Sequence, residues 1–199
     1  MWNAGGYHVS QTTKVCSFAN WYTVATADNA NGDGAVKTYP NVHVDFHNWS
    51  TGFEPRVSTF TTITSRFAHQ SPGAVGIYNF AFDLWLNGVA SAGSTEVMIW
   101  TDNYRQVPAG TKVAQTTISG VTWDVWAASS NHYLAFVPAS SGVVRSGTFD
   151  LKAFLTYLMS SGRLSTTSTL GQVDYGVEVV STDGRPTTFA FTDFALSTS

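Results

Sequence analysis

The sequence predicts an all-β protein built as a two-sheet antiparallel sandwich with one helix. Aromatic residues make up 14% of the 199 residues and charged residues only 12%, a balance that favours sheets over a helical bundle. Apolar and polar residues alternate in ten short segments, which Gly, Pro, Asn and Ser turns separate. One further segment repeats its apolar residues at helical spacing instead.

The expected strands follow one another along the chain. They are residues 21–27, 41–46, 58–67, 77–86, 95–101, 111–118, 121–128, 132–138, 172–181 and 187–196. The sequence contains no linker, internal repeat or low-complexity segment, so we expect a single domain over residues 1–199.

The expected helix lies within residues 149–162. Its apolar face comprises Leu151, Phe154, Leu155 and Leu158, which recur every three or four residues. Thr148 is the expected N-cap, and Gly162 the expected stop. This face should pack against one of the sheets.

Charge and composition exclude several partners. A formal charge of -3 and an isoelectric point near 5.9 leave no basic surface, so neither nucleic acid nor an anionic membrane is expected as a partner. No apolar run approaches the roughly 20 residues that span a bilayer. Cys16 has no partner for an intrachain disulfide and is expected to be a buried thiol. The start "MWNAGG" carries no leader, which fits a cytosolic chain or the mature part of a secreted one.

Two glutamates interrupt apolar strands. Strand alternation places Glu96, Met98 and Trp100 of "STEVMIW" on one face, opposite the core. Glu178 interrupts the apolar run "YGVEVV" in the same way. A carboxylate among packed side chains is costly unless it is paired or hydrated. We therefore expect one sheet face to line a wet cleft.

Asp83 is the third acid of this pattern. It lies on the polar side of "NFAFDLWLN", so it should neighbour Glu96 on an adjacent strand. Two carboxyl groups this close would push their pKa values apart, which would provide one acid and one base. The alternative is a solvated Asp on the polar face of a strand.

Two carboxyl groups in a cleft walled by Trp, Tyr and Met suit glycoside hydrolysis. That reaction needs a proton for the leaving oxygen and a carboxylate for the oxocarbenium-like carbon. A lectin-like sandwich that binds sugar without cutting it fits the same pattern. A peptidase that pairs a Glu with a Gln is a third possibility, with Gln172 near Glu178 as its candidate.

The motifs "STEVMIW", "TWDVW" and "YGVEVVS", together with the single helix, resemble glycoside hydrolase family 12. The resemblance implies a concanavalin A-like jelly roll and a retaining endo-β-1,4-glucanase that acts on cellulose, mixed-linkage glucan or xyloglucan. It implies that Glu96 is the nucleophile, that Glu178 is the acid/base and that Asp83 hydrogen-bonds Glu96. Met98 would line the sugar site, and Trp100, on the same face, would bind sugar. No cofactor or metal is implied.

The N-terminus departs from the family pattern. The resemblance implies one more strand at the N-terminus, which this sequence lacks together with the Cys that would pair near Cys16, and only Trp2 matches the family's sugar-stacking Trp. Glu54 of "TGFEPR" resembles an acid/base motif but precedes the nucleophile strand. We therefore interpret Glu54 as a solvated or weakly paired loop charge. We expect a secreted monomer that acts on β-glucan.

Two apparent metal motifs are rejected. His43, Asp45 and His47 share a strand face but lack a third convincing ligand, so we expect a polar cleft wall. The segment "NANGDG" has the spacing of a calcium loop, but Pro40 stands where the bidentate Glu belongs, so we expect a hairpin turn. Four further tryptophans are expected in the cleft floor or the core: Trp21, Trp49, Trp123 and Trp126.

Overall fold

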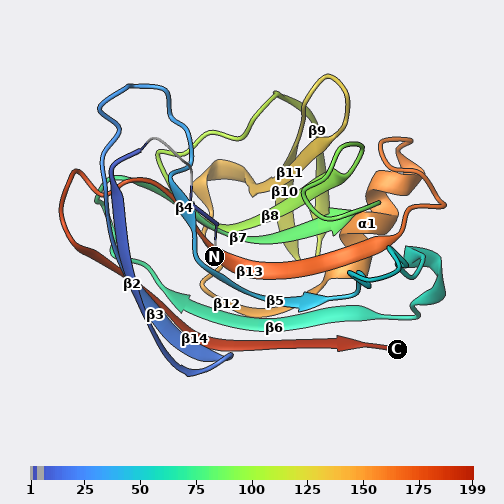
Figure 1. Cartoon of the computed structure of the whole chain (residues 1–199). Coiled ribbons are helices and arrows are strands. Elements are labelled where there is room, and N and C mark those ends of the chain that lie inside the picture. The colour runs from blue at the N-terminus through green and yellow to red at the C-terminus, as the bar shows by residue number, and fades with distance from the viewer. Residues whose placement is uncertain (1, 4–6) are drawn as a thin grey trace.

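A computed structural model of the chain describes residues 2–3 and 7–199. Within this described part, two β-sheets of nine and five strands are stacked face to face (Figure 1). The larger sheet has the order β1 (Trp2–Asn3), β4 (Thr38–Tyr39), β13 (Leu170–Ser181), β7 (Ile77–Leu86), β8 (Thr95–Tyr104), β11 (Tyr133–Pro138), β10 (Val121–Ala127) and β9 (Thr111–Ile118), and β5 (Asn41–Asp45) also pairs with β13. The smaller sheet has the order β12 (Ser146–Asp150), β6 (Ile63–Gln70), β14 (Thr187–Thr198), β3 (Asn20–Ala27) and β2 (Val9–Ser17).

The predicted sandwich is confirmed, and every expected strand segment contains an observed strand. Four strands were not predicted: β1, β2, β4 and β12. One pairing also differs from the antiparallel expectation, because β11 runs parallel to β8 with Tyr133 opposite Glu96. The larger sheet curls upward at its β9, β10 and β11 edge, so its outer face is concave (Figure 1).

Period-two alternation sorts the strand residues between the core and the concave face. On β7 the core face comprises Phe80, Phe82, Leu84 and Leu86, each fully buried. These side chains meet the smaller sheet, where Phe67 packs edge-on against Phe82 at 5.3 Å between ring centroids. Trp21 also belongs to this core and stacks on Phe191 at 4.0 Å. The opposite face of β7 is left for the cleft.

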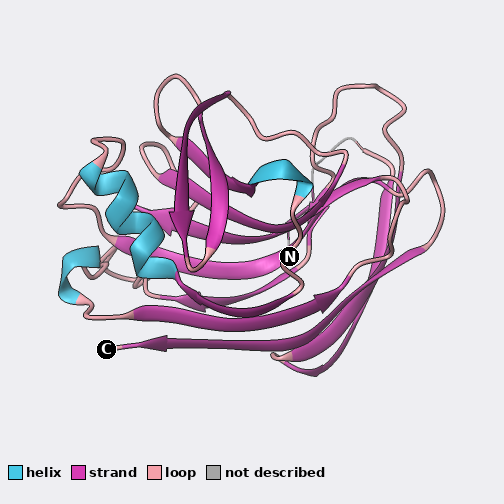
Figure 2. Ribbon diagram, turned by 180° about the vertical axis from the view of Figure 1, so that it is seen from behind, coloured by secondary structure: helices cyan, strands magenta, loops and turns pink. Residues whose placement is uncertain are grey.

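The predicted helix is α1 (Leu151–Ser160), and its apolar face is buried as expected. Phe154 of α1 packs against Trp123 of β10 and Phe136 of β11, so the helix lies on the larger sheet (Figure 2). Asp150, and not the predicted Thr148, caps the helix by accepting a hydrogen bond from the Ala153 backbone N–H. Two short 3-10 helices, Val57–Thr59 and Ala139–Ser141, complete the helical elements of the described residues.

Gly162 follows the helix with φ of 72°, the left-handed conformation expected at a helix stop. Cys16 lies exposed on the edge strand β2, so the expected burial of its thiol is wrong. Among the described residues, no helix is long and apolar enough to cross a membrane.

Candidate active site

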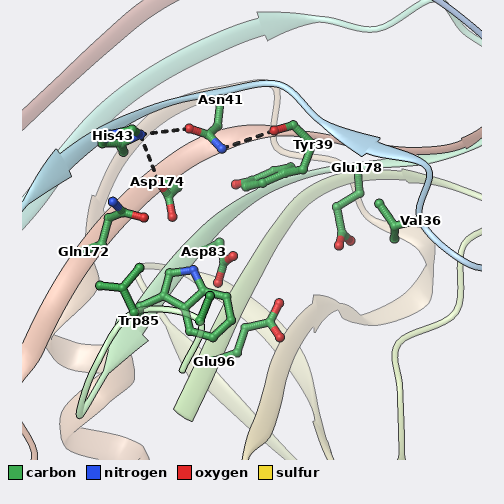
Figure 3. Close-up of a pocket in the computed structure, with 12 residues that line it drawn as sticks. Val36, Tyr39, Asn41, His43, Asp83, Trp85, Glu96, Gln172, Asp174 and Glu178 are labelled. Atoms are coloured by element: carbon green, nitrogen blue, oxygen red, sulfur yellow. Dashed lines mark hydrogen bonds and ion pairs between the residues drawn. The ribbon is translucent and has the colours of Figure 1, made fainter. Parts of the chain in front are cut away.

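The three predicted acids share one cleft on the concave face. Glu96 comes from β8, Asp83 from β7 and Glu178 from β13. They line a cavity of about 530 Å³, and the carboxyl groups of Glu96 and Glu178 both point into it (Figure 3). The cavity-lining residues are Val36, Tyr39, Asn41, His43, Asp83, Trp85, Val89, Ala90, Glu96, Gln172, Asp174 and Glu178.

Strand register fixes the positions of these acids. On β7, Trp85 pairs with Glu96, whereas Asn79 pairs with Glu178 six residues away along the same strand. Asp83 lies between these two rows, next to the row of Glu96. The two glutamates therefore extend toward each other from opposite ends of a stretch of β7.

Burial raises the pKa of both glutamates. For Glu96, burial and then the negative charge of Glu178 raise the pKa to about 8. For Glu178, burial raises the pKa to about 7, and the amide of Asn79 acts in the opposite direction. The pair therefore resists carrying two charges near neutral pH, and a state with one proton between the two carboxyl groups is favoured.

Asp174 is a fourth acid, which the sequence reasoning missed. It lies on β13 directly opposite Asp83 and is only 2% exposed. Burial, and then the charge of Asp45, raises its pKa to about 8. Asp83 also has a raised pKa, because of burial and then the charge of Glu96, and the indole of Trp85 lowers it only in part. Alternation on β13 places Asp174 on the face of Glu178, so this signal was present in the sequence.

Tyr39 and Asn79 were also missed. Tyr39 is buried among the four acids, and its hydroxyl donates to the carbonyl of Ala81 at 3.2 Å. Burial, and then the charge of Asp83, raises the pKa of this hydroxyl, so it stays protonated. Asn79 is fully buried opposite Glu178. Tyr39 interrupts no apolar pattern, whereas alternation places Asn79 on the same face of β7 as Asp83, so the signal for Asn79 was present in the sequence.

The wall formed by β5 is polar, as expected. Asn41 and His43 line the cleft (Figure 3), and Gln172 donates a hydrogen bond to Asp45. The His43 Nε2 atom lies 3.6 Å from Asp45 Oδ2. Within the described chain, no group of three His, Cys, Asp or Glu side chains could hold a metal ion. His47 turns away and contacts Glu54 instead.

Two of the predicted sugar contacts are buried behind the cleft. Met98 and Trp100 lie on the predicted face, but each is only 1% exposed and neither lines the cavity. Trp126 and Tyr133 from neighbouring strands pack against them, and the Tyr133 hydroxyl lies 3.4 Å from the Met98 sulfur. Their predicted contact with sugar stays a prediction.

Other tryptophans divide between core, support and surface. Trp21 and Trp123 are core residues, whereas Trp49 is 66% exposed and belongs to neither the core nor the cleft floor. The backbone of Trp2 pairs with Tyr39 at the edge of the larger sheet. The side chain of Trp2 lies outside the described part of the chain, so its predicted sugar contact stays a prediction.

Glu54 is not the solvated loop charge that we expected. Its side chain is 5% exposed and accepts hydrogen bonds from His47 Nδ1 at 2.7 Å, the Gly88 backbone N–H at 3.1 Å and the Thr169 hydroxyl. Although burial raises its pKa, these hydrogen bonds lower it on balance. Glu54 does not line the cavity, and it joins three loops beside it.

The rejected calcium motif holds a cation of the chain itself. The Lys37 ammonium lies 3.0 Å from Asp33 Oδ1 and 2.6 Å from the Ala35 carbonyl, and its side chain is 1% exposed. The neighbouring Val36 lines the cavity. The loop connects β3 of the smaller sheet with β4 of the larger sheet, so it is not the hairpin turn that we expected.

A concave β-sandwich cleft with carboxyl groups from two separate strands defines the class of acid/base polysaccharide hydrolases. The sequence model described as glycosyl hydrolase family 12 matches residues 1–199. The chain belongs to this family.

Relatives agree with that assignment. The chain is 28% identical over 193 residues to endoglucanase A of Aspergillus kawachii, covering 91% of this chain and 76% of the relative. It is 25% identical over 185 residues to the xyloglucan-specific endo-beta-1,4-glucanase A of Emericella nidulans, covering 90% and 73%. It spans 63% of the length of endoglucanase S of Pectobacterium parmentieri, to which it is 26% identical over 170 residues, covering 76% of this chain.

A solved structure has the same fold. The family 12 xyloglucanase of Bacillus licheniformis superposes with a TM-score of 0.81 over 100% of this chain and 90% of that chain, at 23% identity. The jelly-roll architecture of the described chain is therefore the architecture of a family 12 protein.

Proposed function

We propose that this chain is a retaining endo-β-1,4-glucanase. The observation that carries the proposal is the convergence of Glu96 and Glu178 from β8 and β13 into one cleft (Figure 3). The names of the relatives, endoglucanase and xyloglucan-specific endo-beta-1,4-glucanase, support internal cleavage of a β-1,4-linked glucan. No cofactor enters the mechanism. Because the substrate is a polymer that cannot cross a membrane, we propose that the protein is secreted. We also propose that it acts as a monomer.

In the first step, the Glu96 carboxylate attacks the anomeric carbon while Glu178 donates its proton to the departing glycosidic oxygen. The bond to the leaving sugar breaks and an ester between Glu96 and the glycosyl group forms. In the second step, Glu178 removes a proton from water, which attacks the same carbon and releases Glu96. Two inversions return the original configuration.

The roles of the two glutamates come from the family resemblance and not from their pKa order. Burial and the charge of Glu178 raise the pKa of Glu96, so Glu96 needs a hydrogen-bond donor to hold its negative charge. Asp83, one row away on β7, is the nearest acid that could supply such a donor.

The proposed activity is tested on soluble mixed-linkage glucan and xyloglucan, with casein in parallel. We expect viscosity to fall quickly while few reducing ends form, which marks endo cleavage, and we expect the first product to be the β-anomer by proton NMR. Relative rates on the two glucans give the substrate preference. Sugar binding without new ends would support a lectin-like protein instead, and casein cleavage would support a peptidase that uses Gln172.

A further inference from the structure

Asp83 and Asp174 form a directly opposed carboxyl pair on the cleft face. The register between β7 and β13 places them opposite each other, where Cβ atoms lie about 4.5–5.5 Å apart. They are 5% and 2% exposed. The Oδ1 atom of each is buried without a hydrogen-bond partner. Each side chain thus has an oxygen available for a proton or for a donor.

Two negative charges at this position would be unfavourable. Like charges directly opposite each other on a sheet repel, and burial withholds the water that would screen them. No Lys or Arg side chain is among the described residues that line the cavity. The pair is therefore favoured to share one proton, as other closely spaced carboxyl pairs do.

The surroundings decide which member keeps the proton. His43 on β5 lies with Nδ1 3.6 Å from Asp174 Oδ1 and 3.2 Å from Asn41 Oδ1, so a charged Asp174 would face a polar ring and not an apolar side chain. Asp45 on β5 opposes this by its own charge, but it is bound by Gln172 and lies near His43 Nε2.

On the other side of the pair, Glu96 on β8 faces Asp83, with Glu178 farther along β13 and the protonated Tyr39 hydroxyl on β4. Placing the proton on Asp83 separates the charges of Asp174 and Glu96 by a neutral acid. The other arrangement would set a charged Asp83 beside a charged Glu96.

We propose that Asp174 is a positioning residue whose negative charge keeps the proton on Asp83, so that Asp83 can donate a hydrogen bond to the Glu96 carboxylate. The inference rests on the proposed role of Glu96 as nucleophile. A donor to the charged form of Glu96 favours that form and so allows it to attack while Glu178 still holds its proton. It supplies the donor that the buried Glu96 carboxylate requires.

The test is the pH profile of kcat for D174N. The amide removes the charge opposite Asp83, so Asp83 should lose its proton at lower pH. We expect the basic limb of kcat to move about one pH unit toward acid and kcat to fall about 10-fold, with KM within about twofold. D124N is the matched control, because Asp124 lies on β10 away from the cavity and pairs with Lys112. Its profile should superpose on that of the wild type.

A double variant separates an effect through Asp83 from a direct effect. In D83N the amide at position 83 cannot ionise, so adding D174N should produce no further shift of the basic limb. A shift that persists in D83N/D174N would overturn the inference. So would a D174N profile that keeps the wild-type limbs and is merely lower, which is the result of a structural role alone.

Carboxyl carbon-13 NMR of the wild-type enzyme gives a measurement that does not depend on the folding of D174N. We expect one carboxyl group of the pair, identified with D83N, to stay protonated at pH values well above the ordinary 3.8 of an Asp. Ionisation of both groups near that ordinary value would overturn the inference. A wild-type protein that cuts no glucan would instead refute the proposed function, so the two failures are distinguishable.

Discussion

The larger sheet buries acids on both of its faces, and the pKa values of these acids shift in opposite directions on the two faces. On the core side, Asp102 of β8 lies 3.1 Å from Arg145 Nε and 3.5 Å from His69 Nε2. Although burial raises its pKa, these neighbours lower it on balance. In the cleft, Glu96 on the same strand has no such partner, and its pKa rises to about 8. Asp102 shows that an acid on β8 can have partners that stabilise its charge. The lack of such partners around Glu96 therefore points to a functional role for Glu96.

The core side gives Asp102 a guanidinium partner, whereas no Lys or Arg is among the described residues that line the cleft cavity. His69 Nδ1 lies 2.7 Å from the Tyr175 hydroxyl, which also lies 3.4 Å from the Thr101 hydroxyl. Burial lowers the pKa of His69, so the ring is held neutral in the core. Removing a cleft acid should therefore abolish activity without lowering stability. Removing Asp102 should lower stability without abolishing activity.

The largest effect is expected for E96Q and E178Q. Each variant should lose at least about 10²-fold in kcat/KM on soluble β-glucan, because the nucleophile or the general acid is gone. The melting temperature should stay the same or rise, since an amide carries no buried charge. Initial rates with calorimetry on the same samples check both parts. Losses below about tenfold in either variant would count against a catalytic pair.

The second effect concerns Asp102. D102N should lower the free energy of unfolding by about 1–3 kcal/mol, because a buried carboxylate that accepts from the Arg145 guanidinium is replaced by a neutral amide. Its kcat should match the wild-type value within about twofold. Urea unfolding and initial rates provide the measurement. A stable D102N with low kcat would erase the distinction between the two faces.

Glu54 lies between these extremes, because it is buried beside the cleft yet fully hydrogen-bonded. Its pKa is lowered from 4.5, so it contributes stability above pH 4.5, which is lost as the pH falls through its folded value. E54Q should therefore be less stable at neutral pH by about 1–2 kcal/mol. Its stability should also fall less steeply than that of the wild type below pH 4.5. Parallel curves for the two proteins would show that Glu54 is solvated after all.

The smallest expected effect is a slope in thermal stability. Burial raises the pKa of Glu178 from 4.5 to about 7. The folded state therefore binds this proton more tightly than the unfolded chain, and stability decreases as pH rises from 4.5 through 7. E178Q should remove this part of the pH dependence of the melting temperature. We expect a change of only about 2 °C between pH 4.5 and 7, because the Glu178 side chain is only half-buried. An unchanged slope would show that water solvates the carboxylate.

Much of the fold was predictable because alternation reports the face of a strand directly. It placed Glu96, Glu178 and Asp83 on one side without any knowledge of strand order. The same rule, applied to residues 172–178, would have found Asp174. The edge strand β2 was missed because its residues Val9–Ser17 are mostly polar or exposed, so no buried face marks it.

The burial of a side chain was harder to predict than the face of the sheet on which it lies. Trp100 lies on the predicted side, but Trp126 comes from another strand and packs against its cluster. Glu54 looked like a loop charge because its local sequence is turn-like, yet two of its partners are Gly88 and Thr169, far away in the chain. Interactions of this kind depend on tertiary packing, which local patterns do not encode.

Trapping the glycosyl-enzyme intermediate tests the central claim most directly. A 2-deoxy-2-fluoro cello-oligosaccharide with an activated leaving group should inactivate the enzyme by slowing the second step more than the first. Mass analysis of the digested protein should then find one added glycosyl group on the peptide that carries residues 94–100, bound to Glu96. A label on Glu178, or complete inactivation without any covalent label, would contradict the account.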